Sequence, residues 1–261
     1  MRQTVIELKP VSPEYKNESG QAAALTLMIH DTQPERRFPM VIVVPGGCYT
    51  RCSKREGEPV AMRYYSYGYN AAVLDYSVKD KPFPTALLEL REAVRYIRDN
   101  LDSLCCVNDI TVVGFSAGGH LAASLGVYGG DDRPDRLILC YPVISSGEYG
   151  HAESVANIAP TPELAETVSL EKHITEDFPP SFIWHCADDK TVPVENSLML
   201  AAELSRCRIP YELHVFPHGG HGIALCDITT VKDENFDRYI EPHAAEWFRL
   251  SLDFLGHKFD K

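Results

Sequence analysis

A serine between two glycines is the first residue whose surroundings point to chemistry. Ser116 lies in Gly114-Phe115-Ser116-Ala117-Gly118, between the apolar run Ile110 to Val113 and the helix-forming run Ala117 to Val127. At such a strand-to-helix turn a serine exposes its hydroxyl, and flanking glycines remove side chains that would clash. The helix that follows would direct the N–H of Ala117 toward an oxyanion. A plain tight turn is the alternative, but the strand and helix on either side favour a nucleophile.

A serine hydroxyl needs a base to remove its proton and a carboxylate to orient that base. Both occur downstream, each after an expected strand: Asp188 and Asp189 follow Phe182 to Trp184, whereas His218 and His221 follow Tyr211 to Phe216. The order serine, acid, base differs from that of chymotrypsin and of subtilisin. From these residues alone, either aspartate and either histidine could serve.

The two histidines also allow interpretations other than a catalytic base. They could belong to an ordinary surface loop, or their H-x-x-H spacing near two aspartates could hold a metal ion. Zinc sites favour histidine pairs on a helix with a third defined ligand, so the pattern predicts no metal here.

A glycine-rich turn, Pro45-Gly46-Gly47-Cys48, follows the apolar run Val41 to Val44. A second oxyanion donor is expected at this place, and the backbone N–H of Gly47 or of Cys48 could supply it. A simple β-turn is again the alternative. The Cys48 thiol lacks a base of its own, so we do not expect it to be a nucleophile.

Strands and helices alternate along most of the chain, which predicts an α/β fold with a mostly parallel sheet and helices on both faces. The active residues should then lie beyond the carboxyl ends of the strands. The other expected strands are Thr4 to Leu8, Ala23 to Ile29, Ala71 to Leu74 and Arg136 to Cys140, and the other expected helices are Pro84 to Leu101, Asn196 to Ser205 and Glu241 to Leu255. We expect a single domain over 1–261. The stretch 145–180 lacks clear periodicity and is long for a connection, so it is a candidate cap.

The composition limits the classes of partner that the protein is expected to bind. The net charge of −12 disfavours a nucleic acid or an anionic membrane surface, which it would repel. We expect a cytoplasmic protein, because MRQTVIELKP lacks the apolar core of a signal peptide and no apolar run reaches the roughly 18 to 20 residues of a membrane span. Several of the eight cysteines fall in apolar stretches, which favours reduced thiols. The oligomeric state stays open.

Four segments together resemble the bacterial acetyl esterase and xylan-esterase-like branch of the α/β-hydrolase superfamily. They are P-G-G-x-Y, G-F-S-A-G-G-H, D-D-x-x-V-P-V-E-N-S and F-P-H-G-G-H-G, and the resemblance spans Phe38 to Leu225. It implies an α/β-hydrolase fold with Ser116 as nucleophile, His221 as base and Asp189 as acid. Two positions depart from the pattern: Pro45 to Cys48 replaces the familiar H-G-G-G turn, and Cys186 replaces a usual glycine.

The resemblance implies hydrolysis of a small carboxylic ester, in particular an acetyl ester of a sugar, through an acyl-enzyme and without a cofactor. An arylformamidase on the same fold is the main alternative. A small peptidase of the prolyl-oligopeptidase type is another, although 261 residues leave no room for the propeller that usually accompanies it. A non-catalytic binding module would need a broken triad, whereas all three residue types are present.

Overall fold

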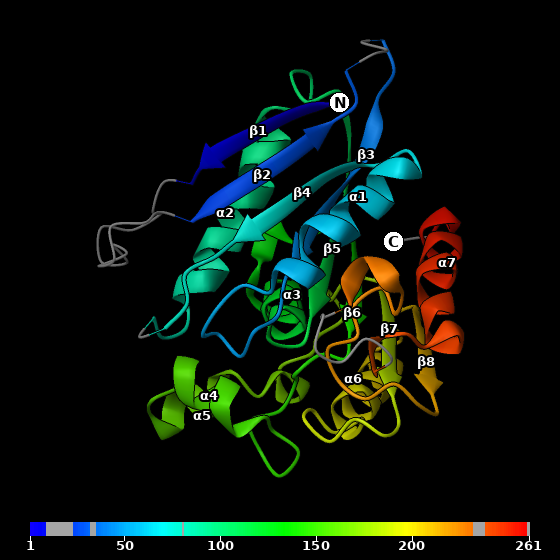
Figure 1. Ribbon diagram of the computed structural model, residues 1–261. Helices are drawn as coiled ribbons and strands as arrows, with labels where there is room; N and C mark the ends of the chain where they lie inside the picture. The colour runs from blue at the N-terminus through cyan, green and yellow to red at the C-terminus, as the bar shows by residue number, and fades with distance from the viewer. Residues whose placement is uncertain (9–22, 32–34, 80, 232–237, 260–261) are drawn as a thin grey trace.

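The structure is a computed structural model that describes residues 1–8, 23–31, 35–79, 81–231 and 238–259. Its centre is one eight-stranded sheet in the order β1-β2-β4-β3-β5-β6-β7-β8 (Figure 1). The strands are β1 (Arg2–Glu7), β2 (Ala24–Ile29), β3 (Phe38–Val44), β4 (Asn70–Asp75), β5 (Cys106–Phe115), β6 (Arg136–Cys140), β7 (Ser181–Cys186) and β8 (Tyr211–Phe216). Strand β2 runs antiparallel to both its neighbours, and all pairs from β4 to β8 are parallel.

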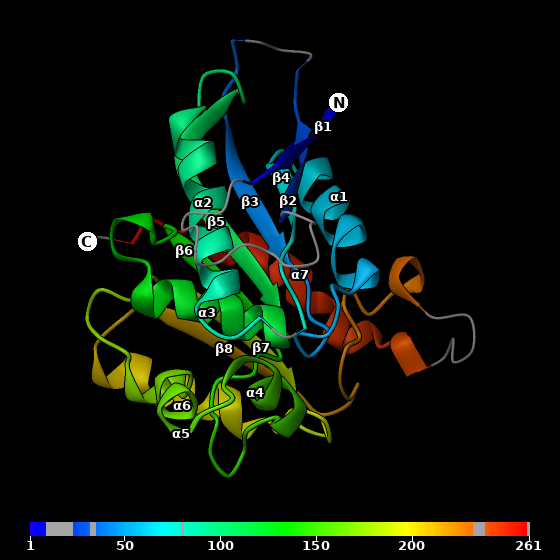
Figure 2. The same cartoon turned by 90° about the vertical axis from the view of Figure 1, so that its left-hand side faces the viewer.

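Helices cover both faces of the sheet, as expected (Figures 1 and 2). They are α1 (Glu58–Ser66), α2 (Thr85–Asp99), α3 (Ala117–Tyr128), α4 (Ala152–Ile158), α5 (Pro162–Thr167), α6 (Glu195–Arg206) and α7 (Pro242–Gly256). Apolar side chains of α2, α3 and α6 belong to one buried cluster, and those of α1 and α7 to another on the opposite face. The central strands of the sheet are therefore buried on both sides, which explains why they are continuous apolar runs in the sequence.

The expected strands and helices are present, with ends that differ by a few residues. Helix α1 is not among the helices that the sequence predicted, and Pro59 occupies its first turn, where proline is tolerated. Within 145–180 the structure forms two short helices. Their first turns are capped by His151 and Thr161, so local hydrogen bonds rather than a periodic apolar face define them.

The carboxyl ends of β3, β5, β7 and β8 lie at the same end of the sheet, because these strands are parallel. The turns that carry the predicted site residues follow these four strands and are thereby brought to the same end. In the part of the chain that the structure describes, no helix combines the length and apolar character needed to span a bilayer.

Candidate active site

The turn between β5 and α3 holds Ser116 in a strained conformation. Its φ of 54° and ψ of −118° lie where residues with side chains are rarely found. The turn is also crowded: a Cβ on Gly114 would lie 2.3 Å from the Gly118 carbonyl oxygen, and a Cβ on Gly118 would lie 2.2 Å from the Val44 oxygen. A hydrogen bond from the Ser116 N–H to the Cys140 oxygen, 3.0 Å long, ties the turn to β6. The two glycines of the motif are therefore steric necessities.

The structure brings Ser116, His221 and Asp189 into one line of hydrogen bonds. Ser116 Oγ lies 2.8 Å from His221 Nε2, and His221 Nδ1 lies 2.6 Å from Asp189 Oδ2. With Asp189 ionised, Nδ1–H donates to the carboxylate and Nε2 is left as the acceptor for the serine hydroxyl. The three side chains are mostly buried, with 4% of Ser116, 7% of Asp189 and 14% of the His221 side chain exposed.

The Asp189 carboxylate is held ionised by its neighbours. Burial alone would raise the pKa of this carboxyl, but hydrogen bonds from His185, from His221 and from the Val192 N–H outweigh burial and hold the pKa well below its usual range. Its other oxygen, Oδ1, accepts from the N–H groups of Thr191 at 2.8 Å and Val192 at 3.0 Å. A fixed negative charge therefore faces the imidazole.

The neighbouring aspartate and histidine point elsewhere. Asp188 Oδ1 accepts a hydrogen bond from the Gly220 N–H at 2.8 Å. Asp188 Oδ2 lies 3.6 Å from His218 Nδ1, and the His218 side chain is 77% exposed. Asp188 and His218 thus form an outer pair that steadies the loop, whereas Asp189 and His221 face the serine. Of the two candidate pairs, Asp189 and His221 therefore lie in the line of hydrogen bonds that reaches Ser116.

The turn after β3 directs its carbonyl groups to one set of partners and its N–H groups away from them. The Gly46 oxygen accepts from the Ser53 N–H at 2.9 Å, and the Gly47 oxygen accepts from the Thr50 N–H at 2.9 Å. In a trans peptide the N–H of the next residue points opposite to the carbonyl. The N–H groups of Gly47 and Cys48 are therefore turned away from these partners, and among the described residues neither donates to a protein acceptor.

This turn touches the serine directly. A Cβ placed on Gly46 would lie 2.9 Å from the Ser116 Cβ and 2.6 Å from the Phe115 oxygen. Ala117 begins helix α3, and within the described residues its N–H has no protein acceptor either. The N–H groups of Gly47, Cys48 and Ala117 are the three candidates that the sequence provided for an oxyanion hole, and they belong to the two turns that meet at Ser116.

The candidate cap segment contacts the site through α4. Asn157 Nδ2 donates to the Cys48 oxygen at 2.8 Å. Burial and the charge of His221 lower the pKa of His151, the capping residue of α4. Helix α4 therefore forms part of the rim of the site and steadies the glycine-rich turn.

Three side chains on this rim have the chemistry of metal ligands. Single ligand atoms of Cys48, His151 and Glu153 lie within 4.8 Å of one another, and this set does not include His218 or His221. Burial and the nearby Glu153 raise the pKa of the Cys48 thiol, which disfavours the thiolate that a metal ion requires. We therefore derive no chemical step through a metal.

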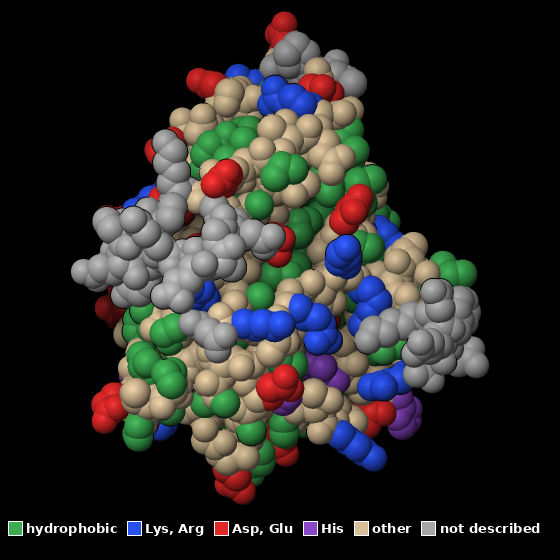
Figure 3. All heavy atoms as spheres, turned by 60° about the vertical axis from the view of Figure 1, so that its left-hand side comes forward, with side chains coloured by type: hydrophobic (Ala, Val, Ile, Leu, Met, Phe, Trp, Pro, Cys, Tyr) green, Lys and Arg blue, Asp and Glu red, His purple; other side chains and the backbone are tan. Residues whose placement is uncertain are grey.

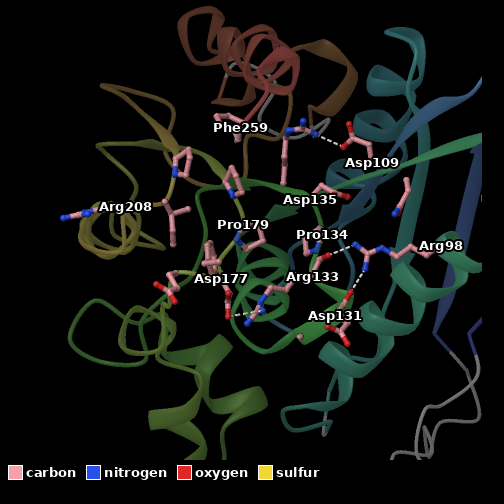
Figure 4. A pocket seen from close by; sticks show the side chains of 18 residues that line it. Arg98, Asp109, Asp131, Arg133, Pro134, Asp135, Asp177, Pro179, Arg208 and Phe259 are labelled. Atoms are coloured by element: carbon pink, nitrogen blue, oxygen red, sulfur yellow. Dashed lines mark hydrogen bonds and ion pairs between the residues drawn. The ribbon is translucent and has the colours of Figure 1, made fainter. Parts of the chain in front are cut away.

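A separate hollow lies at the opposite end of the sheet. It has a volume of about 780 Å³ and is lined by residues next to the amino ends of β5, β6, β7 and β8, none of which is a predicted site residue. In Figure 4, dashed lines join several of its charged side chains to one another or to backbone, as for Asp109, which lies 2.6 Å from Arg136, whereas Arg208 has no such line. It thus offers no nucleophile with a base beside it. On the face in Figure 3, acidic and basic side chains occur side by side.

Comparisons with known proteins identify families and structures that this chain resembles. The family model described as prolyl oligopeptidase family matches residues 89–249, and the model described as BD-FAE matches residues 27–141. A solved structure of an acetyl ester-xyloside bifunctional hydrolase from Caldicellulosiruptor lactoaceticus is 35% identical, with a TM-score of 0.81 and 97% of both chains covered.

Two curated relatives carry names from xylan degradation. An endo-1,4-beta-xylanase B of Butyrivibrio fibrisolvens is 37% identical over 82% of this chain and 37% of its own length. An acetylxylan esterase of Xylanibacter ruminicola is 29% identical over 71% of this chain and 41% of its own length. The chain thus spans well under half of these two relatives.

Proposed function

The chain belongs to the α/β-hydrolase superfamily, in a branch that contains bacterial esterases and shares the prolyl oligopeptidase family domain, and from this premise we propose that it is a serine esterase. Its substrates are short-chain carboxylic esters, and Ser116, His221 and Asp189 carry the reaction. The observation that supports this most is the continuous line of hydrogen bonds from Asp189 through His221 to the strained Ser116.

The proposed reaction is acyl transfer through a covalent intermediate. His221 Nε2 takes the proton as Ser116 Oγ attacks the ester carbonyl, and the resulting oxyanion accepts from the N–H of Ala117 and from that of Gly47 or Cys48. When the intermediate collapses, the C–O bond to the alcohol breaks and His221 returns its proton to that alcohol. A water molecule, deprotonated by His221, then releases the acid and restores Ser116.

We assign acetyl as the acyl group and a sugar as the alcohol. The support comes from the names of the similar proteins, which mention an acetyl ester, a xyloside and acetylxylan. The Cys48 side chain stands where the family pattern has glycine, so it would reduce the room beside the carbonyl carbon. Short acyl groups are therefore favoured over long ones.

The test is hydrolysis of p-nitrophenyl acetate, butyrate and octanoate, with an N-formyl aryl amide in parallel. Wild type, Ser116→Ala and the matched control Ser103→Ala, an exposed serine far from the site, are compared. We expect wild type and Ser103→Ala to cleave acetate fastest and Ser116→Ala to be inactive. Preference for octanoate would contradict the acyl assignment, turnover of the amide alone would indicate a formamidase, and equal activity in Ser116→Ala would refute the proposal.

A further inference from the structure

Glu56 is a buried carboxylate that the chemistry described above does not use. It ends a short 3₁₀ helix, Lys54–Glu56, and only 4% of it is exposed. Among the described residues, no lysine, arginine or histidine forms an ion pair with it. Burying a carboxylate without a cation is unfavourable, so its hydrogen bonds must compensate. Both of its oxygens accept one.

One oxygen of Glu56 fixes the start of the glycine-rich turn. Oε2 accepts from the Gly46 N–H at 3.0 Å. On the other side of the same peptide unit, the Pro45 oxygen accepts from the Tyr76 hydroxyl at 2.8 Å. This peptide is therefore held at both ends, next to the two N–H groups that are to bind the oxyanion.

The other oxygen reaches the loop that carries the base. Oε1 accepts from the Tyr141 hydroxyl at 2.8 Å, and the Tyr141 oxygen in turn accepts from the Ala224 N–H at 3.0 Å. The Tyr141 ring lies edge-on to the His221 imidazole, with 5.0 Å between ring centroids. Glu56 is thus two hydrogen bonds away from the backbone that follows His221.

The preceding residue holds the same loop from a second direction. The Arg55 guanidinium donates to the Gly222 oxygen at 2.8 Å and to the Thr230 oxygen at 2.7 Å. Residues 55 and 56 therefore connect the loop after β8 with the turn after β3. These two segments are remote in sequence, and both must be correctly placed around the same substrate carbonyl.

We propose that Glu56 is a positioning residue, which holds the oxyanion turn and the His221 loop at a fixed spacing; this inference rests on the proposed esterase function. The charge matters because a carboxylate accepts at both oxygens and forms stronger hydrogen bonds than a neutral group. A glutamine would keep its oxygen for the Gly46 N–H and turn its NH₂ toward Tyr141. The tyrosine hydroxyl would then lose its acceptor, and the link to the His221 loop would weaken.

The experiment combines Glu56→Gln, Tyr141→Phe and the double variant, with Glu58→Gln as a control because Glu58 is exposed and only two residues away. For p-nitrophenyl acetate, we expect Glu56→Gln to lower kcat roughly 10- to 100-fold, less than the loss of a direct oxyanion donor, and to change KM by less than about threefold, since Glu56 does not touch the substrate. The double variant should lose little more than the worse single variant, because both changes break one link. Glu58→Gln should match wild type.

A kcat for Glu56→Gln within about twofold of wild type would overturn the inference, as would losses that multiply in the double variant. A merely structural role would lower the melting temperature and leave kcat per folded molecule unchanged. If Glu56→Gln does not fold, Tyr141→Phe decides, since it removes only the hydroxyl. Wild type and Ser116→Ala, assayed alongside, test the function separately: if they hydrolyse the ester equally, the proposed function fails and this inference with it.

Discussion

Replacing Gly46 with alanine tests whether close packing of the glycine-rich turn, Pro45 to Cys48, against Ser116 is needed for activity. The added Cβ would lie 2.6 Å from the Phe115 oxygen, 2.9 Å from Glu56 Oε2 and 2.9 Å from the Ser116 Cβ. Ordinary contact for a Cβ begins at 3.4 Å, so the turn and the nucleophile strand must separate by about 0.8 Å. Two of the three atoms belong to the strand-to-helix turn itself, which cannot move away as a flexible side chain can.

A shift of this size is large for catalysis. Misplacement of reacting groups by about 1 Å can reduce a rate about 100-fold, which corresponds to about 2.7 kcal/mol of transition-state stabilisation. We therefore expect kcat/KM of Gly46→Ala to fall by about two orders of magnitude, mainly through kcat, because the oxyanion donors act in the transition state.

The assay is p-nitrophenyl acetate hydrolysis, with folding monitored by circular dichroism. Gly256→Ala at the end of α7 is the matched control, since a Cβ there has no heavy atom within 4 Å, and it should retain full activity. If Gly46→Ala is folded and hydrolyses the ester at the wild-type rate, then the turn does not position the oxyanion donors in the way described, and the reasoning is refuted.

Three further predictions follow from single contacts. Asp189→Asn should lower kcat about 10³- to 10⁴-fold in the same assay, whereas Asp188→Asn should change it less than about threefold; equal losses would contradict the assignment of the acid. Asn157→Ala should lower kcat several-fold by freeing the Cys48 carbonyl, and an unchanged kcat would show that α4 does not steady the turn. Burial lowers the pKa of His120 from 6.5 to about 4. Between pH 6.5 and about pH 4, His120 is protonated more readily in the unfolded chain than in the folded one. The free energy of unfolding should therefore fall by up to about 3 kcal/mol as the pH drops through this range. Denaturant titrations at pH 7 and 4.5 should show that the free energy of unfolding falls less for His120→Gln than for wild type. An equal fall in the two proteins would show that His120 is not the cause.

The three residues of the proposed site could be selected from the sequence because each leaves a local signature in the chain. Ser116 needs glycines on both sides, and Asp189 and His221 follow apolar strands at short distances. The choice between adjacent candidates depends on which way a side chain leaves its turn. For Asp188 and Asp189 the residues themselves left that choice open, the family pattern favoured Asp189, and only the structure shows the two side chains diverging.

Glu56 could not be predicted in the same way. It lies in the charged run Lys54 to Glu58, which reads as solvated surface, and its partners Gly46 and Tyr141 are 10 and 85 residues away. Only the folded sheet brings them together. Helix α1 was missed for a related reason. Only Val60, Ala61 and Tyr64 of this helix are buried, so its apolar pattern is too short to distinguish a helix from a connection.

The position of β8 at the edge of the sheet has a consequence for how activity is lost. Ser116 follows a central strand that is paired on both sides. His221 follows β8, which among the described residues pairs with β7 alone. Edge elements with few buried contacts open locally at lower free energy than the core around them. On warming, the imidazole should therefore leave the serine before the sheet melts, and loss of turnover should precede loss of secondary structure. The hydrogen bonds from Arg55 to Gly222 and Thr230 resist this opening, so they should reduce the difference between the two temperatures.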